Sequence, residues 1–177
     1  MTYYGAAELA ESFRTVRRNT IQIAQDIPED KYSFSASPDT RTVEKLLTHI
    51  ALGYRFQYQI NAVERRSSAD GFDFMGMFQQ LAAEEAKPRN KAAVIELLQK
   101  EGEIWANFVA GTSEDFLSQI VSFPEGIRPP TKSRLELITT VKEHEMHHRA
   151  QLMLIERIIG VVPHLTRQMQ ERMAQRR

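Results

Sequence analysis

The feature of this sequence that most constrains its fold is a recurring spacing of apolar residues at steps of three and four. This spacing puts apolar side chains on one face of an α-helix, and that face has to pack against other helices. Four long segments show it, at residues 9–27, 46–63, 94–108 and 137–159. We therefore expect four amphipathic helices around a shared core.

The ends of the last of these helices are marked most clearly. Ser133 followed by Glu136 forms a capping box, and Gly160 with Pro163 beyond it supplies a stop. The fourth helix should therefore be roughly 26 residues long, or about 39 Å at 1.5 Å per residue. For the second helix, either residue 39 or residue 40 can act as the N-cap, because both have short oxygen-bearing side chains.

The remaining segments predict an all-α four-helix bundle with additions. A long crossover between the second and third helices contains a short helix over residues 74–86, and residues 118–130 form a hairpin-like excursion. We expect one domain over residues 1–177, with the bundle core at about 5–160 and an extra C-terminal helix in the polar tail at 163–177.

Composition limits the kinds of partner that the protein can have. Lys+Arg and Asp+Glu both number 23, so the formal net charge is zero and no overall field attracts nucleic acid or an anionic membrane. No apolar run approaches about 18 residues, and Glu8 and Glu11 interrupt the N-terminal segment where a secretion signal would be apolar. We expect a cytoplasmic protein that binds neither nucleic acid nor a membrane.

Three of the five histidines fall on predicted apolar faces. At about 100° per residue, His144 and His148 straddle the apolar stripe of the fourth helix, whereas His147 lies to one side. His49 lies on the stripe of the second helix. Buried imidazoles need hydrogen-bond partners, and one shared metal ion would satisfy all three. A lone buried histidine is usually a satisfied core residue, but three together favour a metal site; His164 is expected at the surface.

The fourth helix also contains the H-E-x-x-H pattern of zinc metalloproteases, formed by His144, Glu145 and His148. The extended metzincin pattern would place glycine and histidine where this chain has Gln151 and Leu154, and no strand-rich region precedes the helix. We therefore reject the protease interpretation. Glu145 is kept as a candidate acid or base, or as a group that orients a ligand.

Four further residues are candidates for roles around the ligands. Glu101 lies on the apolar stripe of the third helix, where an unpaired carboxylate is costly, so it either orients a ligand, acts as a base or reaches solvent at the helix edge. Tyr54, Trp105 and Gln151 border the expected ligand positions and are candidates for lining a substrate pocket. Core packing is the alternative for Trp105.

The chemistry of three imidazoles narrows the metal to zinc, nickel, copper or ferrous iron, because calcium and magnesium prefer oxygen ligands. Three protein ligands leave at least one position open, which is typical of catalytic sites and allows water or a thiol to be activated. The chain has no cysteine, so any such thiol would be a cosubstrate.

Two segments, TVEKLLTHIA and EHEMHHRAQLMLI, together resemble the DinB-like (YfiT-like) family of metal-binding helix bundles. That family has a second-helix motif ending in Leu-x-His and a fourth-helix segment H-x-x-x-H-R-G-Q. The likeness covers roughly residues 5–160 and implies His49, His144 and His148 as the metal ligands. Ala150 stands where the family commonly has glycine.

The resemblance also implies an up-down-down-up order of the four helices, a homodimer, and a bound divalent ion, with nickel or zinc ahead of iron. Some members of the family are thiol S-transferases that use bacillithiol or mycothiol, and some are maleylpyruvate isomerases. Two classes of function stay open. One is a metal-dependent hydrolase or low-molecular-weight-thiol S-transferase acting on a small molecule. The other is a non-catalytic, stress-related metal-binding or sensing bundle.

Overall fold

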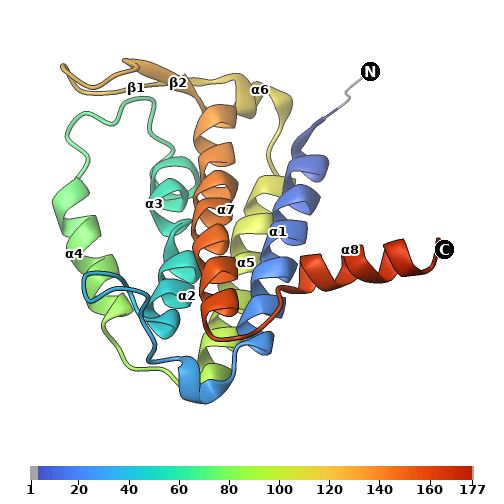
Figure 1. Ribbon diagram of the computed structural model, residues 1–177. Helices are drawn as coiled ribbons and strands as arrows, with labels where there is room; N and C mark the ends of the chain where they lie inside the picture. The colour runs from blue at the N-terminus through green and yellow to red at the C-terminus, as the bar shows by residue number, and fades with distance from the viewer. Residues whose placement is uncertain (1–3, 177) are drawn as a thin grey trace.

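The computed structural model describes residues 4–176 and is built mostly from helices (Figure 1). Four rods form the expected all-α four-helix bundle. The second rod is composite, because α2 is followed by the short helix α3 and the π-helical turn η2. The rods are α1 (Ala6–Asp26), α2 (Val43–Leu52) with α3 (Arg55–Tyr58) and η2 (Gln59–Val63), α5 (Lys91–Ala110) and α7 (Arg134–Ile158).

The direction of the rods confirms the up-down-down-up order. In Figure 1, α1 and α7 run from top to bottom, whereas the α2–α3 rod and α5 both run from bottom to top. Two consecutive parallel rods need a long crossover, and this one carries α4 (Phe74–Glu85), which stands beside α2. Helix α1 packs against α5 and α7, and α2 packs against the same two helices.

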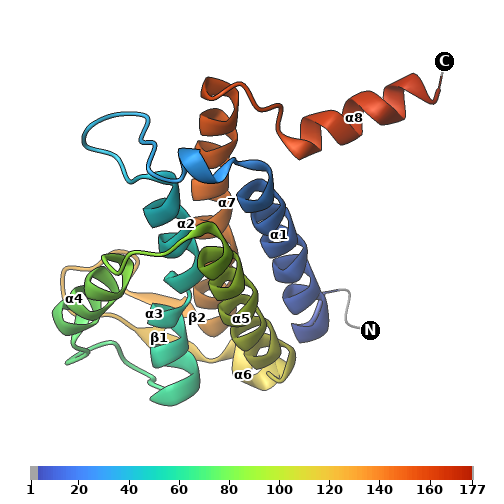
Figure 2. The same ribbon diagram turned by 90° about the horizontal axis from the view of Figure 1, so that it is seen from below.

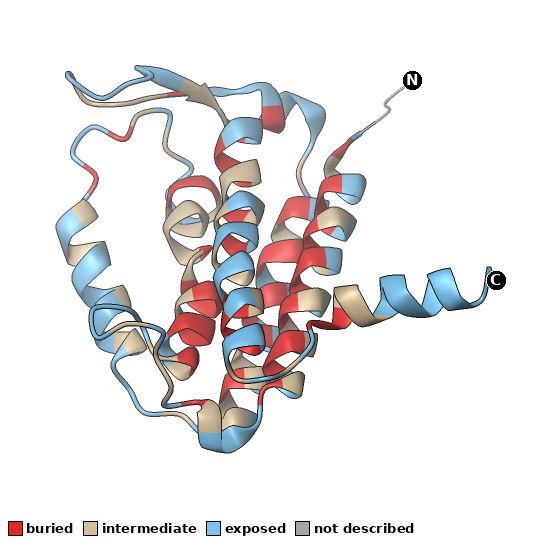
Figure 3. Ribbon diagram, viewed as in Figure 1, coloured by how far each residue is buried: buried red, intermediate tan, exposed pale blue. Residues whose placement is uncertain are grey.

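The interior of the bundle contains two apolar clusters, with buried residues facing inward on all four rods (Figure 3). One cluster joins the end of α1 to α2, α5 and the end of α7. The other joins the start of α1 to α3, the end of α5 and the start of α7. Members of the first include Ile23, Ile27, Tyr32, Leu47, Ile50, Leu98 and Leu152, and members of the second include Phe13, Tyr54, Trp105 and Ile138.

Between the two clusters lies a buried ion pair that connects all four rods. The Nη2 of Arg17 in α1 lies 2.9 Å from an Oε of Glu145 in α7, and the hydroxyl of Thr20 donates to the same carboxylate at 2.7 Å. Arg17 also donates to the carbonyl oxygens of Leu98 in α5 and Ile50 in α2. Because both charges are almost fully buried, each depends on the other for its stability in the core.

The short elements close the ends of the bundle. The 3₁₀ turn η1 (Glu29–Lys31) follows α1, and α6 (Glu114–Ser118) follows α5. The expected hairpin-like excursion is present as β1 (Ile120–Ser122) paired antiparallel with β2 (Thr131–Ser133). The capping box at the start of α7 is confirmed, since the side chain of Ser133 accepts from the backbone of Glu136 and Glu136 reaches back to the Ser133 backbone.

The N-cap of α2 differs from the prediction. Thr42 caps the helix, because its side chain accepts a hydrogen bond from the backbone N–H of Lys45 at 3.3 Å. The two predicted caps bond within the preceding loop instead. Asp39 accepts from the Ser37 hydroxyl, and Thr40 donates to the Ser37 carbonyl oxygen. A local turn therefore competes successfully for both side chains.

The tail forms α8 (His164–Ala174), which projects away from the bundle (Figures 1 and 2). Its first residue contradicts the expectation of a surface histidine, because His164 is only 3% exposed and its Nε2 lies 3.2 Å from Oδ1 of Asn19 in α1. The buried Pro163 turns the chain so that the start of α8 packs on α1. Beyond that turn α8 is largely exposed. The homodimer expected from the sequence stays a prediction.

Among residues 4–176, no helix combines the length and the apolar character that a bilayer span needs.

Candidate metal centre

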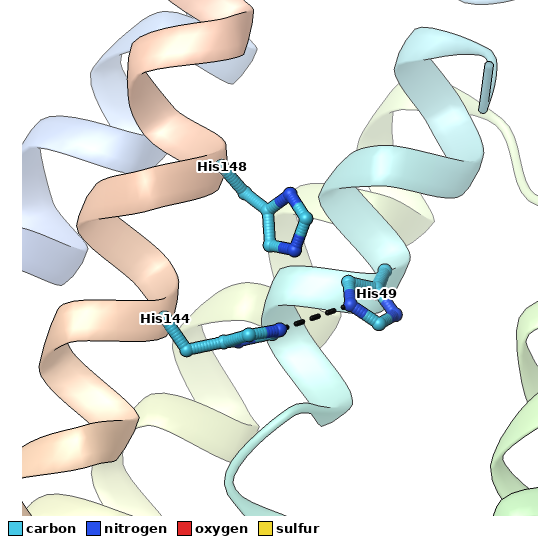
Figure 4. Close-up of side chains that lie close together, drawn as sticks. All are labelled: His49, His144 and His148. Atoms are coloured by element: carbon cyan, nitrogen blue, oxygen red, sulfur yellow. Dashed lines mark hydrogen bonds between the residues drawn. The ribbon is translucent and has the colours of Figure 1, made fainter.

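Three histidines from two rods converge on one point (Figure 4). His144 and His148 lie one turn apart on α7, and His49 faces them from α2. The Nε2 atoms of His49 and His144 are 3.1 Å apart. One ring nitrogen from each of the three residues falls within a group whose members all lie within 4.8 Å of one another. The structure therefore brings together the three residues that the sequence predicted as ligands.

The three rings are half-buried rather than fully buried, which corrects the sequence-based expectation for His144 and His148. The buried face of α7 is formed by Leu137, Val141, Glu145 and Leu152, and its centre lies about 70° around the helix from His144. His144 thus lies toward the edge of the buried face. Both rings contact cavities, where a small molecule could reach them.

The outer nitrogens of two rings are held by oxygen acceptors. An Oε of Glu85 lies 3.0 Å from Nδ1 of His49, and Oε1 of Gln151 lies 2.8 Å from Nδ1 of His148. Because a carboxylate and an amide oxygen only accept, each Nδ1 carries the proton and each Nε2 keeps its lone pair. In His49 that lone pair faces Nε2 of His144, at 3.1 Å. This is the arrangement by which proteins orient histidine ligands toward a metal.

The environment keeps the rings of His144 and His148 neutral. Burial, together with the neighbouring imidazoles and Arg41, lowers the pKa of His144 to about 4. Burial also lowers the pKa of His148, although the hydrogen bond with Gln151 opposes this. Neutral imidazole is the form that binds a metal, so no proton has to be displaced from His144 or His148 at neutral pH.

One pair of ring nitrogens has a spacing close to that around a tetrahedral ion. Two nitrogen ligands at about 2.1 Å from zinc and at a tetrahedral angle lie about 3.4 Å apart. The 3.1 Å between the Nε2 atoms of His49 and His144 is close to that value. A set of three imidazole donors suits zinc, nickel or ferrous iron and does not suit calcium or magnesium.

A glycine makes room for one of the rings. A Cβ atom at Gly53 would lie 2.9 Å from both Cε1 and Nδ1 of His144 and 3.3 Å from the carbonyl oxygen of His49. The absence of a side chain at this position therefore lets α7 bring His144 close to the second rod. The sequence alone predicted no role for Gly53.

Sequence reasoning missed Glu85 and Arg41 entirely. Glu85 is at the end of α4, where it accepts hydrogen bonds from His49 and from Nε of Arg41. Burial by itself raises the pKa of Glu85, but these two hydrogen bonds outweigh it and hold the pKa below its usual value. Glu85 is therefore an ionised acceptor. No signal in the sequence indicates that the crossover brings this carboxylate to His49.

Two cavities flank the histidines. The larger, of about 410 Å³, contacts His49 and His144 and extends between the second rod and α4. The smaller, of about 380 Å³, contacts His148 and Gln151. Arg41 lines both cavities. Each volume is within the range of about 300–1,000 Å³ that small-molecule sites occupy.

Several predicted site residues lie elsewhere. Glu101 accepts hydrogen bonds from Tyr54 and Arg55, each at 2.8 Å, so it is paired within the bundle and does not orient a histidine. These hydrogen bonds hold the pKa of Glu101 below its usual value, against the opposite effect of burial. Tyr54 and Trp105 pack against each other in the second apolar cluster and line neither cavity beside the histidines, which corrects their assignment to the pocket.

Glu145 is also corrected. Its carboxylate faces α1, where Arg17 and Thr20 donate to both oxygens, so it is a structural ion-pair partner and not an acid or base at the histidines. Gln151, in contrast, does lie at the site. His147 is exposed, and its ring packs beside His148 outside the group of three.

The fold and the site together define a class of protein, a four-helix bundle with a candidate metal centre between its second and fourth rods. The chain belongs to the DinB superfamily, whose sequence pattern matches residues 12–152. No curated protein sequence matches the chain significantly.

Two solved structures from Bacillus subtilis are similar to this fold. One is a DinB-like protein, YjoA, with 19% sequence identity and a TM-score of 0.65 over 86% of this chain and 92% of the other. The second is YfiT, described as a probable metal-dependent hydrolase with an unusual four-helix bundle topology, with 12% identity and a TM-score of 0.68 over 91% of both chains. At these identities the likeness establishes the fold.

Proposed function

We propose that this protein is a metal-dependent hydrolase of a small molecule, and that His49, His144 and His148 bind its divalent ion, with zinc or nickel ahead of iron. The observation that carries the proposal is the convergence of three imidazole nitrogens next to a cavity of about 410 Å³. The description of YfiT as a probable metal-dependent hydrolase supports the same conclusion.

The ion would act as a Lewis acid at the coordination position that three protein ligands leave open. The chain's own residues prepare the site. Glu85 and Gln151 fix two of the rings through their Nδ1 atoms, and Gly53 allows the third to approach. The apolar wall of the larger cavity would exclude water from the body of a substrate.

A low-molecular-weight-thiol S-transferase is the second candidate, and the smaller cavity favours it. That cavity contacts His148, so a thiol cosubstrate and an electrophile could approach the ion from different sides. Because both cavities are open beside the histidines, an enzyme accounts for the site better than a non-catalytic metal-binding or sensing bundle.

Metal analysis followed by activity assays tests the proposed function. Metal content is measured in the purified protein, and the protein is then loaded with zinc, nickel or iron(II). Each loaded form is assayed with chromogenic esters and amides without thiol, and with an epoxide or chlorinated aromatic in the presence and absence of thiol.

Ester or amide turnover that is independent of thiol and absent in His144→Ala supports the hydrolase, and strictly thiol-dependent loss of the electrophile supports the transferase. Fully loaded protein that is inactive in every assay, with a fourth side chain completing the coordination, would contradict both.

A further inference from the structure

We propose that Arg41 binds the carboxylate of the substrate, and that the substrate is a small monocarboxylate whose aromatic or aliphatic body fills the larger cavity. This inference rests on the proposed function for its position next to a catalytic ion. It adds the chemical class of the substrate and the residue that selects it.

The position of Arg41 is the first argument. It lies directly before the Thr42 cap of α2, and its side chain is 42% exposed and lines both cavities that contact the histidines. Its guanidinium is one residue away from a ligand, since Glu85 accepts from Nε of Arg41 with one carboxylate oxygen and from Nδ1 of His49 with the other. A ligand group held by Arg41 would therefore lie close to the three rings.

The guanidinium group has unused donors. Its Nε donates to Glu85, and among residues 4–176 no group accepts a hydrogen bond from either Nη atom of Arg41. The two Nη atoms form the edge of the guanidinium that binds a planar carboxylate with two parallel hydrogen bonds. Because Glu85 already fixes the orientation of the group, little conformational freedom is lost when a ligand binds.

The wall of the larger cavity would contact the aromatic or aliphatic body of the substrate. It is formed mainly by apolar side chains, and Phe78 on α4 is 57% exposed there. The rings of Phe56 and Phe78 face the same space, with centroids 5.7 Å apart. Exposed aromatic side chains gathered at a cavity indicate a surface that an apolar ligand covers. The apolar wall consists of Leu52, Phe56, Phe78, Leu81 and Ala82.

The charge balance favours an anion. Glu85 is the one acidic residue among the described residues that line the larger cavity, and its charge is matched by Arg41. Three neutral imidazoles do not offset the charge of a divalent ion, so the loaded site has an excess of positive charge beside an apolar wall. A carboxylate compensates that charge, whereas a neutral amide of the same shape does not.

Binding of two matched probes tests the inference. Calorimetric titration compares 4-phenylbutyrate with the neutral 4-phenylbutanamide, on zinc-loaded and on metal-free protein. We expect the carboxylate to bind roughly tenfold tighter or more in both forms, as a charged hydrogen-bonded pair predicts. Arg41→Gln should remove this preference in the metal-free protein and reduce it in the zinc-loaded protein, where the charge of the ion remains. Amide affinity should be unchanged in this variant, and Arg41→Lys should keep part of the preference.

Three controls test whether the loss of the carboxylate preference in Arg41→Gln is specific to Arg41. Arg18→Gln removes an exposed arginine that lines neither cavity beside the histidines and should leave the preference intact. Phe78→Ala should weaken both probes equally, because it removes only apolar contact. Measured zinc content and melting temperature should be the same in Arg41→Gln as in the wild type.

The outcomes distinguish this inference from the proposed function. A preference that appears only with zinc and survives in Arg41→Gln means that the ion itself binds the carboxylate, and it overturns the role of Arg41. Equal affinity for the two probes, or binding of neither, overturns the substrate class. If the protein binds no metal but the metal-free form keeps an Arg41-dependent preference, the proposed hydrolase fails and the anion site stands.

Discussion

The carboxylate of Glu85 accepts a hydrogen bond from Nδ1 of His49 at 3.0 Å, so the crossover helix α4 fixes a ring on α2. Helix α4 has no fully buried residue, and it would contribute little to the bundle core. Its position beside α2 instead supplies an oriented ring and one wall of the larger cavity. The crossover is thus a functional part of the site.

Removing that carboxylate should weaken metal binding. We expect Glu85→Gln to lower zinc affinity by roughly tenfold or more, because His49 loses the charged acceptor that orients it. Competition with a chromogenic chelator measures the affinity. Glu84→Gln is the matched control, since Glu84 is the preceding residue in α4 and pairs with Lys87 and Arg89 away from the histidines. Equal affinities for the two variants would rule out the orienting role.

Adding a methyl group at Gly53 should disturb the same site from the other side. The new Cβ would lie 2.9 Å from the ring of His144, so Gly53→Ala forces that ring or α7 to move, at a cost of about 1–3 kcal/mol. We expect weaker zinc binding and a lower free energy of unfolding. Gly111→Ala provides the comparison, because its Cβ would meet only ordinary contacts at 3.5 Å and beyond. Wild-type zinc affinity in Gly53→Ala would show that the close approach has no importance.

The ion pair of Arg17 and Glu145 should matter for stability and not for metal binding. Glu145→Gln leaves the buried guanidinium without its counter-charge, and we expect a loss of about 3–5 kcal/mol in the free energy of unfolding. Urea denaturation measures this, and metal analysis should still find wild-type zinc content. The double variant Arg17→Met with Glu145→Met should recover part of the stability. A Glu145→Gln protein of normal stability that has lost its zinc would point to a role at the metal centre instead.

Glu156 should make stability depend on pH. Its side chain is fully buried, and neither carboxylate oxygen has a hydrogen-bond partner among the described residues. Burial, reinforced by the nearby Asp26 and opposed by Arg167 and Arg157, raises its pKa from 4.5 to about 7. Between these two values the folded protein holds a proton that the unfolded chain has released.

The contribution of Glu156 to stability is therefore fully present below about pH 4.5 and decreases as pH rises to about 7, by on the order of 3 kcal/mol. Glu156→Gln removes this dependence, so its stability relative to wild type should increase between pH 5 and pH 8. Urea denaturation at both pH values checks this, with Glu171→Gln on the exposed part of α8 as control. A constant difference between variant and wild type would show that Glu156 does not titrate in this range.

Local periodicity was sufficient to predict the four rods and to place the three histidines on the inward-facing sides of two of them. Apolar spacing places His49, His144 and His148 on inward-facing sides of their helices, and the resemblance to a known family names the same three. Periodicity says nothing about how the crossover packs. Arg41 and Glu85, which depend on the position of α4, could therefore not be found from the sequence.

Two glutamates were the main source of error. Glu101 looked like a functional group because an unpaired buried carboxylate is costly, and Glu145 because it belongs to the H-E-x-x-H pattern beside two of the histidines. Their partners, however, are Arg55 and Arg17 on other rods, and these pairings follow only from the packing. When the sequence predicts that a charged residue is buried, it also predicts that this residue has a partner. It does not say whether the partner is a metal-binding histidine or another charged side chain.

Zinc stoichiometry in four single variants tests the central claim most directly. After equilibrium dialysis and metal analysis, we expect about one zinc per chain in the wild type and in His147→Ala, because His147 lies outside the converging group. His49→Ala, His144→Ala and His148→Ala, each checked for native helical content, should retain little zinc. Retention of full zinc by His148→Ala together with its loss in His147→Ala would contradict the assignment, and absence of zinc from the wild type would contradict the metal centre itself.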